Sequence, residues 1–177
     1  REDKEFYPFA KTIEYIVNSL DAQVVIMSHQ NGFELPPNFK LIPGRDYPIA
    51  KQLYEVTMKR GKVKKSDVTL ISTPYLPSET KAIIKHFDMF ISGRVHGFVA
   101  AISQSVPTVL INRGFGGKSH RNIGFARSVG LEEYIADPHS IEDMKSKINQ
   151  CWNNREKIRQ FLDQKIPQVK DQARMAF

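Results

Sequence analysis

A guanidinium and an imidazole stand two residues apart in the segment Ser92-Gly93-Arg94-Val95-His96-Gly97. An arginine can bind a carboxylate or a phosphate through two parallel hydrogen bonds, and a histidine can bind an anion or move a proton near neutral pH. Glycines on both sides let a ligand approach the main chain closely. These residue types predict a site for a small anion. Its candidate catalytic residues are Arg94 and His96, and its other candidate contacts are Ser92, Gly93 and Gly97.

The charge around this segment has one sign. No acidic residue lies between Asp88 and Glu132, whereas basic and imidazole side chains are frequent there: Arg94, His96, Arg113, Lys118, His120, Arg121 and Arg127. An anion with several charges is held best where cations gather and carboxylates are missing. We therefore expect Arg113 and Lys118, in the glycine-rich stretch 112–118, to join the site. Two plainer readings remain open, a solvated loop and a turn in which Arg94 and His96 bind local carbonyls.

A strand and a helix must position the segment. Residues 89–91 read as a strand, the apolar run 98–102 as a buried helix, and residues 106–111 as the next strand. Upstream, the pattern predicts helices over residues 6–20, 48–60 and 78–86, the last with Ser78 as N-cap, and strands over 24–27 and 68–72. Downstream, it predicts a loop over 112–120, a helix over 122–129 and a C-terminal helix over about 140–175 with Ser140 as N-cap.

Strands that alternate with helices predict an α/β fold, a Rossmann-like, doubly wound and mostly parallel sheet, in one domain over residues 1–177. Ligands in such folds bind beyond the carboxyl ends of the strands. His29 follows the predicted strand 24–27 and is therefore a further candidate for substrate binding. An ordinary loop histidine is the alternative reading of His29.

Composition limits the class of protein. The 177 residues are 41% hydrophobic, include a single cysteine, Cys151, and carry a net charge of +7. No apolar run approaches the roughly 18 residues that a membrane span needs, so we expect a cytoplasmic protein that does not span a membrane. A basic stripe interleaved with aromatics and a recognition helix are both missing, so we expect no nucleic-acid partner. We also expect no metal and no cofactor.

An ordered series of motifs resembles the polysaccharide pyruvyltransferase family. It runs from Thr73-Pro74-Tyr75 through residues 88–97 to residues 106–111, and Lys118 follows. The resemblance covers roughly residues 66–135 and, more weakly, the strand that ends at His29. Family members often have an aromatic residue shortly before the lysine, whereas this chain has Arg113 and Phe115 among glycines.

This resemblance implies a two-domain, glycosyltransferase-B-like enzyme that transfers a pyruvyl group from phosphoenolpyruvate to sugar hydroxyls as a cyclic ketal. The chain would be the C-terminal, donor-binding half, without the N-terminal acceptor domain. The acceptor would be a saccharide or lipid-linked saccharide, a precursor of a cell-surface or extracellular polysaccharide. Arg94 and His96 match the family's arginine and histidine, and Lys118 matches its lysine. His96 would act as acid, as base or as phosphate ligand.

Two other functions fit parts of the sequence. A nucleotide-sugar glycosyltransferase of glycosyltransferase-B fold would also bind a phosphorylated donor at strand ends. Such an enzyme commonly holds the ribose with a carboxylate, and residues 89–131 contain none. A non-catalytic module that binds an anion or a phosphosugar is the second alternative, because a fold does not determine a function.

Overall fold

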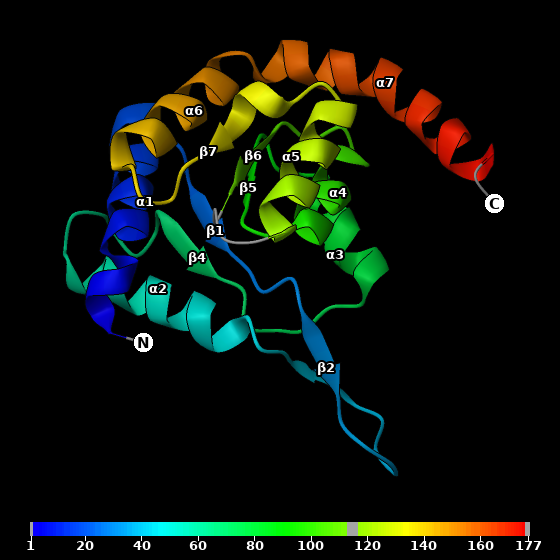
Figure 1. Ribbon diagram of the computed structural model, residues 1–177. Helices are drawn as coiled ribbons and strands as arrows, with labels where there is room; N and C mark the ends of the chain where they lie inside the picture. The colour runs from blue at the N-terminus through cyan, green and yellow to red at the C-terminus, as the bar shows by residue number, and fades with distance from the viewer. Residues whose placement is uncertain (1, 113–116, 176–177) are drawn as a thin grey trace. The chain divides into compact units, whose positions relative to one another are not determined.

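The computed structural model describes residues 2–112 and 117–175, with only the course of the backbone for 117–119 (Figure 1). By their internal contacts the residues form two compact units, Arg1–Thr80 and Lys81–Phe177, which we call unit 1 and unit 2. The single domain over residues 1–177 stays a prediction.

Unit 1 contains a parallel strand pair and two helices in the order that the sequence predicts. Pro8 and Pro48 stand in the first turns of their helices, where a missing N–H costs no hydrogen bond. Strand β1 pairs in parallel with β4, and Val24 is opposite Val68. The elements are η1 Asp3–Phe6, α1 Tyr7–Leu20, β1 Val24–Ile26, β2 Asn31–Phe33, β3 Leu41–Pro43, α2 Tyr47–Lys59 and β4 Val68–Leu70.

Apolar side chains from both helices and both parallel strands form the core of unit 1. Ile13 of α1, Ile26 of β1, Ala50 of α2 and Val68 of β4 form one buried cluster. An ion pair also joins the two helices. Arg60 donates to the Glu14 carboxylate through Nε (2.5 Å) and Nη2 (3.2 Å), and this hydrogen bonding raises the pKa of Arg60.

Strands β2 and β3 form an antiparallel hairpin between the predicted strand 24–27 and the predicted helix 48–60, where the sequence patterns predicted neither strand nor helix. Phe33 is opposite Leu41 in its register. Figure 1 shows the hairpin reaching away from α1, α2 and the β1–β4 pair of the same unit. Asn31 Nδ2 donates to the Tyr75 carbonyl oxygen (2.5 Å), so the base of the hairpin is tied to the loop after β4.

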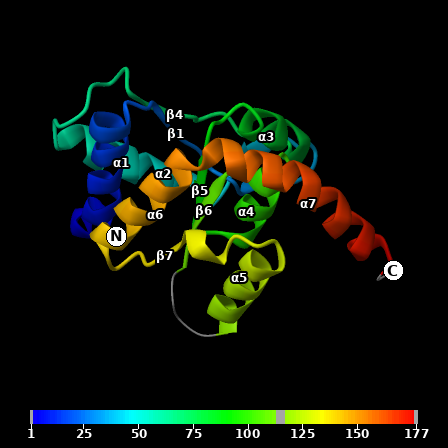
Figure 2. The same cartoon turned by 90° about the horizontal axis from the view of Figure 1, so that it is seen from above.

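Unit 2 contains a three-stranded parallel sheet in the order β5-β6-β7. Helix α4 packs on β5 and β6, and α6 packs on β6 and β7 (Figure 2). The elements are β5 Phe90–Ser92, α4 Val95–Ile102, β6 Thr108–Ile111, α5 Gly117–Ser128, η2 Glu132–Tyr134, β7 Ile135–Ala136, α6 Ile141–Asn153 and α7 Arg155–Met175; helix α3, Pro77–Ile84, spans the boundary between the units.

Three expectations about element ends were wrong. Helix α3 begins at Pro77, before Ser78, and the Glu79 carboxylate accepts the Leu76 N–H (2.7 Å) in its first turn. Helix α5 begins at Gly117, within the stretch expected as loop. The expected C-terminal helix is two helices that meet at Asn154. The N-cap at Ser140 is confirmed, because its Oγ accepts the Asp143 N–H at 3.1 Å.

The core of unit 2 contains the cysteine. Cys151 of α6 is fully buried, and burial, with a smaller effect of Glu133, raises the pKa of its thiol to about 12. Only a thiolate reacts quickly with disulfide reagents. We therefore expect Cys151 of the native chain to be almost unreactive toward Ellman's reagent at pH 8, and to react at once in guanidinium chloride. Rapid reaction without denaturant would contradict this packing of α6.

Within the described ranges, no helix combines the length and the apolar character that crossing a membrane requires.

Candidate functional site

The side chain of Ser92 fixes the turn between β5 and α4. Its Oγ donates to the Arg94 carbonyl oxygen (2.8 Å) and accepts the Arg94 backbone N–H (3.1 Å). Ser92 is itself buried at the last position of β5. One buried hydroxyl therefore holds both polar backbone groups of Arg94, which sets the direction in which its side chain leaves the turn.

Gly97 allows α4 to begin directly against the end of β5. A Cβ atom at Gly97 would lie 2.5 Å from Ser92 Oγ and 3.5 Å from Phe90 Cε1, and the first distance is shorter than real Cβ atoms make. Arg94 has extended backbone angles as the N-cap, and its carbonyl oxygen accepts the Phe98 N–H (3.0 Å). The sequence Ser-Gly-Arg-Val-His-Gly thus builds a close strand-to-helix turn.

The turn exposes one arginine and one histidine side chain to solvent. Arg94 and His96 are both exposed, at the N-cap and in the first turn of α4. That turn contains no acidic residue. The first N–H groups of a helix have no acceptor within the helix and carry partial positive charge, so they favour an anion. Gly93, Arg94 and His96 are therefore the exposed residues of a candidate anion site in unit 2, and the predicted contacts Ser92 and Gly97 are buried within its turn.

Asn112 stands at the same edge of the sheet and was not among the predicted site residues. Ser92 is opposite Leu110 in the parallel register, so Asn112, just past the end of β6, comes next to the turn after β5. Its backbone N–H donates to the Ala136 carbonyl oxygen (2.9 Å). Asp137 follows β7, two strands from β5, and its Oδ1 accepts the His139 N–H (2.9 Å). A polar residue directly after a predicted strand was the signal for Asn112.

Three predicted site residues are not placed in this group. Arg113 lies outside the described residues. Lys118 lies in the first turn of α5, where the structure describes only the backbone. His29 is half-buried and follows β1 in unit 1. Their contributions to the anion site stay predictions.

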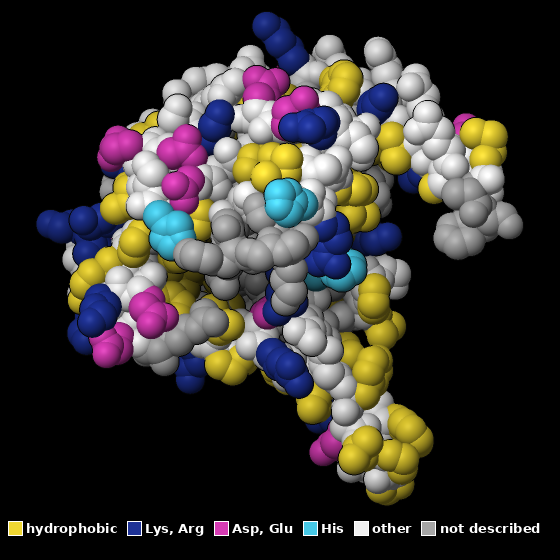
Figure 3. Space-filling model, viewed as in Figure 1, with side chains coloured by type: hydrophobic (Ala, Val, Ile, Leu, Met, Phe, Trp, Pro, Cys, Tyr) yellow, Lys and Arg dark blue, Asp and Glu magenta, His cyan; other side chains and the backbone are white. Residues whose placement is uncertain are grey.

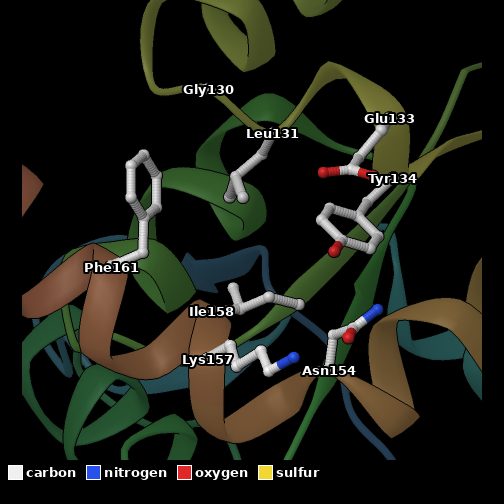
Figure 4. Close-up of a pocket in the computed structure, with 8 residues that line it drawn as sticks. All are labelled: Gly130, Leu131, Glu133, Tyr134, Asn154, Lys157, Ile158 and Phe161. Carbon is white, nitrogen blue, oxygen red and sulfur yellow. The ribbon is translucent and has the colours of Figure 1, made fainter.

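A hollow of about 390 Å³ lies elsewhere on unit 2. Figure 4 shows Glu133 and Tyr134 on one side of it and Asn154, Lys157 and Ile158 on the other. Burial raises the pKa of Tyr134 to about 12, with a smaller effect of Glu133. The residues that line the hollow run from Gly130 to Phe161 and include none of residues 92–97. The hollow and the anion site are therefore different places.

Across residues 2–112 and 117–175, His, Cys, Asp and Glu side chains form no group of three or more that could hold a metal ion.

Comparisons with known proteins agree with this architecture. The family model described as polysaccharide pyruvyl transferase matches residues 5–114, which include the whole Ser92–Gly97 turn and His29. A comparison with curated proteins found no match. Among solved structures, a mutant of the O-GlcNAc transferase from Thermobaculum terrenum is similar, with a TM-score of 0.65 and 15% sequence identity over 94% of this chain. The chain spans 29% of that protein's length.

At this low identity the structural likeness concerns the fold alone. It confirms the prediction of an α/β, glycosyltransferase-B-like fold with parallel strands.

Proposed function

Because the chain belongs to the polysaccharide pyruvyl transferase family, we propose that it binds phosphoenolpyruvate and passes the pyruvyl group to hydroxyls of a saccharide or lipid-linked saccharide. The chain is then a donor-binding part of a transferase. One observation supports this most directly. A buried serine fixes a turn that presents Arg94 and His96 to water at the start of a helix.

The donor matches the turn in charge and in its hydrogen-bonding groups. Phosphoenolpyruvate has a carboxylate and a phosphate, and each can accept two parallel hydrogen bonds from a guanidinium. Arg94 binds one of these groups. The N–H groups in the first turn of α4 accommodate the other, because a helix N-terminus favours negative charge. His96 lies beside them and either donates to the phosphate or carries the proton of the reaction.

Ketal formation moves two protons from the acceptor hydroxyls, one to the donor's carbon and one to the leaving phosphate. The donor's CH₂ carbon takes up a proton and becomes a methyl group, while the neighbouring carbon bonds to two acceptor oxygens and loses its bond to phosphate. The two acceptor hydroxyls release their protons, of which one balances the methyl group and the other the leaving phosphate. The cationic centre formed on the way is stabilised by the negative charge of the donor's own carboxylate, and the departing phosphate by whichever of Arg94 and the helix N-terminus binds it.

Replacing Arg94 by alanine is expected to weaken phosphoenolpyruvate binding by roughly 10- to 100-fold, since a hydrogen bond to a charged group contributes about 1.5–3 kcal/mol. Isothermal titration calorimetry of phosphoenolpyruvate with the 177-residue chain measures this. The free energy of unfolding should change little, because the Arg94 side chain is exposed. Arg94→Lys should restore only part of the affinity, because an ammonium lacks the two-pronged geometry.

Arg127→Ala is the matched control. Arg127 is an exposed arginine in the last turn of α5, also in unit 2, and its loss removes the same charge. We expect this variant to bind phosphoenolpyruvate like the wild type. Equal binding by wild type and Arg94→Ala would refute the site. Tighter binding of a uridine diphosphate sugar than of phosphoenolpyruvate would instead favour a nucleotide-sugar glycosyltransferase.

A further inference from the structure

The β2–β3 hairpin carries large apolar side chains that are open to water. Phe33 is 63% exposed, Leu35 81% and Phe39 67%. Figure 3 shows hydrophobic side chains gathered over the outer end of the hairpin. Single exposed apolar residues are ordinary, but a group of this kind on one short element marks a contact surface.

The register divides the hairpin into two faces. Phe33 is opposite Leu41, so their side chains share a face, and Leu35 follows β2 toward the tip of the hairpin. The next pair falls on the other face, because the Glu34 N–H donates to the Lys40 carbonyl oxygen (2.8 Å). Glu34 and Lys40 balance each other in charge. The outer end of the hairpin, residues 33–41, therefore combines exposed apolar side chains with no net charge.

The base of the hairpin holds this end in place. Gly44, just after β3, passes so close to the Gln30 carbonyl oxygen that a Cβ atom there would collide with it. The Asn31 side chain donates to the Tyr75 carbonyl oxygen at 2.5 Å. The first contact holds the two ends of the hairpin together, and the second ties its base to the loop after β4 in unit 1.

We propose that the outer end of the β2–β3 hairpin inserts into the interface of a phospholipid bilayer that contains anionic lipids. Phe33, Leu35 and Phe39 enter the boundary between headgroups and acyl chains, as apolar side chains of interfacial proteins do. The net charge of +7 attracts the chain to such a surface over longer distances.

The size of the surface favours a bilayer over a second protein. A stable protein interface buries roughly 800 Å² on each partner. A large aromatic side chain covers on the order of 150–250 Å² when fully buried, and Phe33, Leu35 and Phe39 are already partly covered. A bilayer needs no shape-matched partner of that area. The insertion itself does not rest on the proposed function, although it would bring the chain to the membrane that holds a lipid-linked acceptor.

Flotation with vesicles of equal parts phosphatidylglycerol and phosphatidylcholine tests the proposal. We expect the wild-type chain to float with the vesicles and the Phe33→Ser/Phe39→Ser variant to bind at least tenfold more weakly, since each buried phenyl ring contributes about tenfold. The matched control is Phe161→Ser/Met175→Ser on α7, where the side chains are 41% and 80% exposed. This control should bind like the wild type, because it removes exposed apolar surface from another element.

Tryptophan fluorescence tests the insertion even if the serine variant folds poorly. Phe33→Trp in a Trp152→Phe background places the only tryptophan of the chain on the hairpin. Its emission should shift to shorter wavelength with vesicles and be quenched by brominated acyl chains. An unshifted, unquenched spectrum overturns the proposal, as does binding that 0.5 M salt abolishes equally in the wild type and the serine variant. A dimer in light scattering that the serine variant converts to monomer would assign the surface to a second copy. None of these readouts uses phosphoenolpyruvate, so their failure is separate from a failure of the proposed function.

Discussion

Phe98→Ala is expected to lower the free energy of unfolding of the chain by about 3–5 kcal/mol. Phe98 is fully buried in α4, and its ring contacts Phe125 of α5 edge-on, with 5.9 Å between the ring centroids. Truncation leaves a cavity that close packing around β5 and β6 cannot fill. Because a domain is stable by only about 5–15 kcal/mol, this change removes a large share of the total. Urea unfolding followed by circular dichroism measures it.

The matched control is Phe161→Ala on α7. Phe161 is 41% exposed, so the same truncation should cost less than at Phe98, about 1–2 kcal/mol. A double-mutant cycle with Phe125→Ala isolates the ring contact, which we expect to contribute about 0.5–1.5 kcal/mol. A loss at Phe98 as small as that at Phe161 would mean that α4 is not packed as described.

Gly97→Ala is expected to weaken phosphoenolpyruvate binding by on the order of 100-fold and to lower the free energy of unfolding by about 1–3 kcal/mol. The new Cβ atom would lie 2.5 Å from Ser92 Oγ. Ser92 must then rotate away and release both backbone groups of Arg94, or α4 must move from the end of β5. Either response misplaces the guanidinium, the imidazole and the first N–H groups of the helix together. Calorimetry with phosphoenolpyruvate and urea unfolding measure the two effects.

Gly124→Ala is the matched control, because a Cβ atom at Gly124 in α5 meets nothing within 4 Å. This substitution should leave binding unchanged and stabilise the helix by up to about 1 kcal/mol. The double variant Gly97→Ala/Ser92→Ala removes the clashing oxygen, so its stability should recover while phosphoenolpyruvate binding stays weak. Recovery of binding as well would show that Ser92 does not position Arg94.

Sequence patterns determined the α/β class, because the periods of apolar residues in helices and strands are local. Apolar residues at helical spacing, Ile13 and Ile16 among them, predicted helix α1, and the apolar run at 98–102 predicted the buried helix α4. The polar segment between β5 and α4 was recognisable from Ser92, Arg94 and His96 alone, since these residue types match an anion. Local capping chemistry correctly predicted Ser140 as the N-cap of α6. The prediction of Ser78 as the N-cap of α3 was wrong, because the Glu79 carboxylate, three residues after Leu76, accepts the Leu76 N–H instead.

Only the tertiary structure decided which residues meet across the chain. Sequence patterns did not predict the β2–β3 hairpin, because its stability comes from contacts between segments. These contacts are the pairing of the two strands and hydrogen bonds such as that from Asn31 to the Tyr75 carbonyl oxygen. The same holds for Asn112, whose place beside the Ser92 turn follows from the parallel register of β5 and β6. Gly97 is the clearest case. From the sequence, a glycine at this position was expected to leave space for a ligand. In the structure the space is filled by Ser92, because α4 begins in contact with the end of β5.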